Sequence, residues 1–201
     1  MVYHILERVA KTYDLLAEYH LPRSGIEYVV DKMPFPACGN PPDPIMLHWL
    51  ANLSSRRMLN RVHHIVYDQA AAAGVDGEAD VAGTSQRARP ASVASTLQLS
   101  SEFRHQLRTW YDSIPAPIKP DLDRDSPTAD EVILILRYHA TGDIIFRPFL
   151  LQVCSLASPA SVTQSVLENA VACLEHCTEF LRKVGYRTNS PSSSTEITLH
   201  S

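Results

Sequence analysis

The sequence predicts an all-α protein, an irregular bundle of several helices around one central apolar helix at about residues 128–150. Apolar residues recur every three or four positions along five stretches of the chain, which is the spacing of one helix face. The composition is that of a folded protein with a buried core, since 45% of the 201 residues are hydrophobic and 20% are charged. The chain has only 7 glycines, and this together with the long periodic stretches favours helix over sheet.

The first predicted helix covers residues 2–19, and a proline-rich connection follows at 21–44. Residues before proline avoid the α conformation, so we expect this connection to be extended and irregular. Asp43 is placed to cap the next helix, with Pro44 in its first turn, where proline has no helical hydrogen bond to lose. That helix is expected to continue to the residue before Gly74, a plausible stop.

Residues 75–92 are rich in Gly, Ala, Asp and Ser without periodicity, and we expect a mobile loop there. A third helix is predicted over 93–114, where Pro115 ends it. The residues at helical spacing in this stretch are Leu97, Phe103, Leu107 and Trp110.

The central helix is predicted from residues 132–146, which are apolar on nearly every side and therefore need several packing neighbours. Two starts compete. One is Ser126 followed by proline, and the other is Thr128 with Glu131 as a reciprocal capping box. Pro148 is expected to kink or end this helix, because it removes one backbone hydrogen bond and clashes one turn back.

The last helix is predicted to be capped by Ser161 with Gln164 three residues later, and to stop at Gly185. The Ser- and Thr-rich residues 186–201 are expected to form a disordered tail. The chain is therefore predicted to be one helical domain, 1–185, followed by that tail. The expected apolar stripe of the last helix is Val162, Val166, Ala170, Leu174, Cys177 and Leu181.

Charge and cysteine usage limit the partners. The formal net charge of −4 disfavours direct binding of DNA, which needs several Lys and Arg contacts to phosphates. No secretory signal is evident in the charged first stretch, so the four cysteines are expected to be reduced in an intracellular, soluble protein. No run of eighteen apolar residues occurs, so no membrane partner is expected.

Two groups of residues imitate metal sites. Cys173, His176 and Cys177 share one side of a helix, but a structural zinc site needs four ligands, so core thiols are the favoured interpretation and no metal ligand is assigned. The acidic residues at 121–125 begin like a calcium loop. That pattern fails at Ser126, where the loop needs glycine, so a solvated acidic loop is the favoured interpretation.

Candidate catalytic residues are equally weak. Glu175 and Glu179 lie one turn apart, but Lys183 is an ordinary helix-surface partner for the second. No nucleophile elbow, phosphate-binding glycine loop or dinucleotide-binding motif occurs. The sequence therefore predicts no enzyme and no catalytic residue. A basic patch is formed by Arg56, Arg57, Arg61, His63 and His64. It could bind an acidic partner or a phosphate, but the favoured interpretation is a solvated face with some charges paired internally.

Four segments resemble one family when they are taken in order. Residues 134–150 form an apolar helix that keeps Arg, Tyr and His and runs into Arg-Pro-Phe-Leu at 147–150. Residues 50–63 end in an Arg pair followed by Leu-Asn-Arg-Val-His, 103–115 contain a Trp ahead of Ile-Pro, and 167–181 form the helix after the Arg-Pro-Phe-Leu segment. Together they resemble the middle homology region of fungal zinc-cluster transcription factors, the fungal-specific transcription factor domain.

The resemblance implies an all-helical regulatory domain in the nucleus that controls RNA polymerase II transcription, for example of secondary metabolism. Its implied partners are proteins of the transcription machinery or a full-length factor, and a small effector. DNA reading and zinc belong to a separate six-cysteine module in that family, which these four cysteines do not form, so no cofactor and no DNA contact are expected here. The residues that carry the resemblance, with expected structural roles, are Arg56, Arg57, Asn60, Arg61, His63, Trp110, Tyr138, His139, Arg147, Pro148 and Phe149.

Within the matched hallmark, Phe149 is expected to fill the core and Arg147 to pair with Asp143 one turn back. Because the zinc cluster is lacking, the chain is expected to be a fragment, a truncated gene product or a genuine short protein. Two alternatives stay open. One is a free-standing interaction protein that competes with a full-length factor, and the other is a helical enzyme or small-molecule carrier with its site between the second and central helices.

Overall fold

A computed structural model describes residues 39–68, 93–155 and 162–189. The predictions for the helix at 2–19, most of the proline-rich connection, the loop at 75–92, the Ser161 cap and the tail from 190 onward concern residues outside these ranges.

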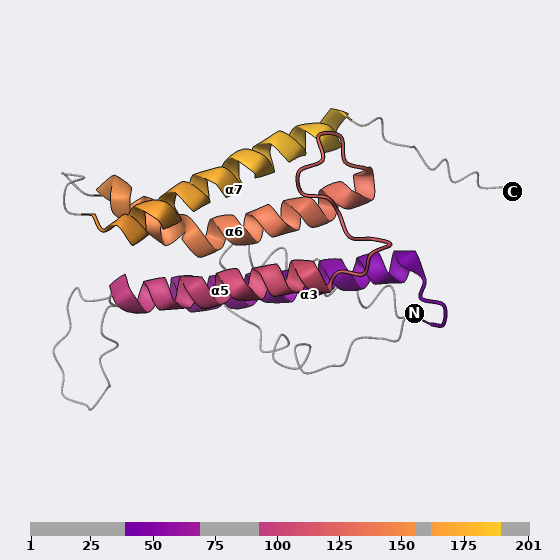
Figure 1. Ribbon diagram of the computed structural model, residues 1–201, viewed down its shortest axis with the longest axis horizontal. Coiled ribbons are helices and arrows are strands. Elements are labelled where there is room, and N and C mark those ends of the chain that lie inside the picture. Colours follow the sequence, from indigo (N-terminus) through magenta and orange to yellow (C-terminus); the bar gives the residue numbers. More distant parts are fainter. Residues whose placement is uncertain (1–38, 69–92, 156–161, 190–201) are drawn as a thin grey trace, which may run out of the picture.

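The described ranges form four α-helices and one short π-helix, with no strand among them, so the all-α prediction is confirmed. Helix α6 runs antiparallel beside α7 and also packs against α3 and α5, which makes it the central helix of the described bundle (Figure 1). No described helix combines the length and apolar composition needed to cross a bilayer. The elements are α3 (Pro44–His63), the π-helix η1 (His64–Asp68), α5 (Val93–Ser113), α6 (Ala129–Ser155) and α7 (Gln164–Asn189).

The hydrophobic core lies where these four helices meet. Phe149 and Leu134 of α6 are fully buried, and Phe146 and Ile145 are nearly so. The predicted core role of Phe149 is therefore confirmed. The other core residues include Val62, Phe103, Leu107, Trp110, Val166, Ala170 and Cys173.

The sequence signals at the helix starts are confirmed where they are described. Asp43 caps α3, and its carboxylate accepts a hydrogen bond from the Ile45 amide at 3.1 Å. Of the two competing starts of α6, the capping box is the one that forms. The Glu131 amide donates to Thr128 Oγ1 at 3.3 Å, and the Thr128 amide donates to the Glu131 carboxylate at 2.8 Å.

Pro148 was expected to kink or end α6, and the ending is ruled out by the structure. The helix continues through it to Ser155. A proline inside a helix costs about 3 kcal/mol. Packing on both sides of Pro148 offsets this cost, because Phe146 and Phe149 are buried in the core, and most helix stability in proteins comes from such packing.

The expected end and apolar face of α7 also differ from the structure. The helix passes through Gly185 to Asn189, so residues 186–189 belong to the helix and not to a tail. A glycine inside a helix costs only about 0.5–1 kcal/mol, which is too little to end a packed one. Leu174 and Leu181 are 51% and 70% exposed, and not part of the buried face. The buried face includes Cys173. Successive residues on a helix point about 100° apart, so Leu174 points away from that face.

A polar site between α6 and α7

Polar side chains from α6 and α7 meet inside the contact between these two helices. Helix α6 contributes three residues spaced one turn apart on one face, and α7 contributes three within one turn. The antiparallel packing brings the two groups together (Figure 1). The six residues are His139, Asp143 and Arg147 of α6, and Cys173, His176 and Cys177 of α7.

Asp143 is the centre of the first half of this site. Arg147 forms an ion pair with its Oδ2, as the sequence predicted, and the Arg147 Nε lies 3.4 Å from Oδ1. The thiols of Cys173 and Cys177 donate to the same Oδ1 at 3.3 and 3.2 Å. Burial acts to raise the pKa of Asp143, but the hydrogen bonds from Arg147 and the thiols outweigh it and hold that pKa below its usual value.

The two thiols are poor nucleophiles in this setting. Burial, and then the neighbouring Asp143 carboxylate, raise the pKa of Cys173 and of Cys177 above the ordinary thiol value. A nucleophilic cysteine needs the opposite, a positively charged and partly exposed environment that stabilises the thiolate. Cys173 is fully buried. The prediction of core thiols agrees with this burial for Cys173, while Cys177 is only partly buried.

A histidine pair forms the second half of the site. Nδ1 of His139 lies 3.1 Å from Nδ1 of His176, so one ring donates its proton and the other accepts it. Burial lowers the pKa of both rings, and the mutual repulsion of the two imidazoles contributes at His139, whose pKa falls to about 4. Both rings are therefore neutral near pH 7.

The His176 ring has close neighbours on several sides. It stacks on Phe146 with 5.8 Å between ring centroids and lies 5.7 Å from Tyr138. It also lies directly over the backbone of Gly142, where a Cβ atom would be 2.4 Å from the imidazole. Gly142 is therefore needed for the close approach of α7 to α6.

Helix α5 is joined to this site through Arg104. Its guanidinium lies 4.5 Å from the centre of the Phe146 ring, a cation–π distance, and donates to Asn169 Oδ1 at 2.7 Å. One side chain thus connects α5 to both α6 and α7. No sequence pattern singled out Arg104 or Gly142, since each depends on contacts between distant segments.

The residues that carry the family resemblance are spread over three helices. Only His139 and Arg147 belong to the polar site, and Tyr138 borders it through its ring contacts with His139 and His176. Trp110 is buried in the core and donates from its indole nitrogen to Ser54 Oγ at 2.9 Å. On α3, Asn60 is buried, Arg61 is exposed, and Arg56, Arg57 and His63 are half-buried.

One surface interpretation needs correction, and another agrees with the structure. Lys183 is not a surface partner of Glu179, because it is fully buried and its ammonium donates to the main-chain carbonyl of Arg124. Glu179 pairs instead with Arg182, at 2.7 Å. The interpretation of residues 121–125 as a solvated acidic loop is confirmed, because Asp121, Asp123 and Asp125 are exposed. Asp125 pairs with Arg182, and Asp121 accepts the amide of Asp123.

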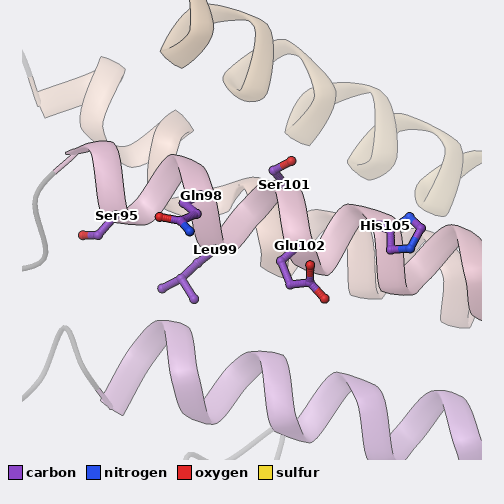
Figure 2. Close-up of a pocket in the computed structure, with 6 residues that line it drawn as sticks. All are labelled: Ser95, Gln98, Leu99, Ser101, Glu102 and His105. Carbon is purple, nitrogen blue, oxygen red and sulfur yellow. The ribbon is translucent and has the colours of Figure 1, made fainter.

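An open hollow lies along α5 and is lined by side chains of that helix (Figure 2). Ser101 points the opposite way from Leu99 and Glu102, so the lining groups do not converge on a common ligand atom. The described residues gather ligand-type atoms at another place. There, Asp143 and the sulfurs of Cys173 and Cys177 lie within 4.8 Å of one another, an arrangement that could hold a metal ion.

Comparison with protein families, with curated proteins and with solved structures finds no match for this chain.

Proposed function

We propose that this chain is a non-catalytic regulatory domain of the kind found in the middle region of fungal zinc-cluster transcription factors. It acts in the nucleus on RNA polymerase II transcription, through contacts with proteins of the transcription machinery or with a full-length factor, and it responds to a small effector. It does not itself bind DNA.

The observation that carries the proposal is the direct contact between segments that resemble the family. Trp110, in the segment 103–115, donates a hydrogen bond to Ser54, in the segment 50–63. Arg137, in the segment 134–150, donates a hydrogen bond to Asn52, in the segment 50–63, at 3.2 Å. Phe149 of the Arg-Pro-Phe-Leu hallmark lies fully buried in the same core. Segments that form one packing unit support a shared family pattern better than separate short motifs would.

The chemistry of the polar site agrees with a structural role. Catalytic acids and bases need a pKa near the working pH and access to a substrate. Here Asp143 is bound by Arg147 and two thiols, the thiols have raised pKa values, and the histidines hydrogen-bond to each other. Each group is engaged with a neighbour within the helix contact.

A tethering assay tests the proposal. The full chain is fused to a heterologous DNA-binding domain and expressed in yeast with a reporter whose promoter carries the matching sites. A second format places the fusion beside a constitutive activator, so that repression is also seen. We expect reporter transcription to differ from that of the DNA-binding domain alone in at least one format.

The matched variants are Phe149→Ala, which removes a buried core side chain, and Gln98→Ala, which changes an exposed residue of α5 outside the segments that resemble the family. The first should lose the effect and the second should keep it. A wild-type fusion of normal abundance that leaves the reporter unchanged in both formats would refute the proposed function.

A further inference from the structure

We propose that Asp143, Cys173 and Cys177 form a binding site for a thiophilic divalent cation of the Zn²⁺ class, which joins α6 to α7. The inference goes beyond the proposed function and does not depend on it. It also assigns a role to cysteines that the sequence alone placed in the core as simple thiols.

The first argument is the spacing of the donor atoms. In tetrahedral zinc sites the bonds to sulfur and to carboxylate oxygen are about 2.3 and 2.0 Å, which separates such ligand atoms by about 3.5 Å. Oδ1 of Asp143 lies 3.3 Å from the Cys173 sulfur and 3.2 Å from the Cys177 sulfur. Shifts of a few tenths of an ångström would therefore bring both oxygen–sulfur distances to the length that a cation requires, and the two sulfurs lie within 4.8 Å of each other.

The second argument is charge. With both thiols deprotonated, the three ligands carry three negative charges in a largely buried place. A divalent cation and the guanidinium of Arg147, which is paired with Asp143, neutralise them together. Buried charge is tolerated when it is balanced in this way.

The third argument is orientation and access. Arg147 pairs with Oδ2 of Asp143 and approaches Oδ1 only at 3.4 Å, while Oδ1 faces the two sulfurs. Outer partners commonly orient metal-binding carboxylates in this way. Two thiolates with one carboxylate favour zinc-like ions over calcium or magnesium, which prefer oxygen ligands. Cys177 is only partly buried and the Arg147 side chain is 42% exposed, which gives the ion a way in.

Binding exchanges protons for the ion. The Cys173 and Cys177 thiols each lose one proton to solvent as the two sulfur–metal bonds form, and Asp143, already ionised, releases none. Two protons therefore leave per ion, and affinity falls steeply as the pH is lowered. The three side chains leave the fourth position of a tetrahedral ion for another donor.

Cobalt binding to the reduced, chelator-treated full chain tests the site. Co²⁺ is expected to give a sulfur-to-cobalt charge-transfer band and the intense visible bands of a tetrahedral ion, which saturate at one ion per chain. Zn²⁺ should bleach these bands, with two protons released per ion in weakly buffered solution. X-ray absorption of the zinc form should show two sulfur ligands at about 2.3 Å and lighter ligands at about 2.0–2.2 Å.

Matched variants locate the site. Cys173→Ser, Cys177→Ser and Asp143→Ala should each lose the saturable bands, while Cys154→Ser, at an exposed cysteine near the end of α6, should keep them. Circular dichroism checks that each variant is helical. If one variant does not fold, the absorption spectrum of the wild-type protein still tests the proposal. Wild-type protein without a charge-transfer band, or bands that persist in the Cys173→Ser/Cys177→Ser variant, would overturn the proposal.

Discussion

Replacing Gly142 with alanine should destabilise the bundle, although alanine is the better helix former. A Cβ atom at Gly142 would lie 2.4 Å from Cε1 of His176 and 2.5 Å from both ring nitrogens. Favourable contacts between such atoms begin at about 3.5 Å. The His176 ring cannot withdraw freely, because it stacks on Phe146 and is hydrogen-bonded to His139.

The expected size follows from two opposing effects. Adding a methyl group to a packed core costs about 1–3 kcal/mol, and the overlap of about 1 Å with three ring atoms places this case near the upper end. Alanine regains about 0.5–1 kcal/mol over glycine inside a helix. The free energy of unfolding of Gly142→Ala should therefore fall by roughly 2 kcal/mol.

Gly185 is the matched control, because it lies in α7 and a Cβ there would meet nothing within 4 Å. Gly185→Ala should raise the free energy of unfolding by about 0.5 kcal/mol. Urea unfolding followed by circular dichroism measures both changes. In a His176→Ala background, Gly142→Ala should become neutral or stabilising. If Gly142→Ala proves as stable as the wild type, the close approach of His176 to α6 is wrong.

Three further predictions use the same unfolding assay. Phe149→Ala should lower the free energy of unfolding by about 3–5 kcal/mol, and a loss below about 1 kcal/mol would remove Phe149 from the core. Thr128→Ala should cost about 1 kcal/mol because it removes the cap that binds the Glu131 amide, whereas Thr128→Ser should cost less. The pKa of His139 is about 4 in the folded chain and about 6.5 when unfolded, so the unfolded state binds more protons between these values. Stability should be full above pH 6.5 and fall by on the order of 2–3 kcal/mol toward pH 4. His139→Gln should flatten this decline, and an unchanged slope would contradict the assignment.

The helices and their starts were predictable because the signals are local. Asp43 and Thr128 each cap a helix through atoms two or three residues away, so the sequence contains both partners of the hydrogen bond. Neither Pro148 nor Gly185 ends its helix, because the local cost of each residue is a few kcal/mol at most. Packing of α6 and α7 against distant residues outweighs it.

The sequence could predict the neighbours within each helix of the polar site, but not the contact between the two helices. Helical spacing groups Cys173 with Cys177, and separately pairs Asp143 with Arg147. That these two pairs touch depends on how α6 lies against α7, which no local pattern specifies. The burial of Lys183 is a similar case. Its ammonium donates a hydrogen bond to a distant main-chain carbonyl, and the sequence does not distinguish such a lysine from one on the surface.

Lys183 also provides a natural probe of bundle opening. Its amine contacts the backbone at Arg124, in the connection between α5 and α6, so an acylating reagent can reach it only after that connection separates from α7. Lys119 lies in the same connection with 31% of its side chain exposed, and should react at once. The ratio of the two labelling rates, measured by mass spectrometry, therefore reports how often the connection between α5 and α6 separates from α7.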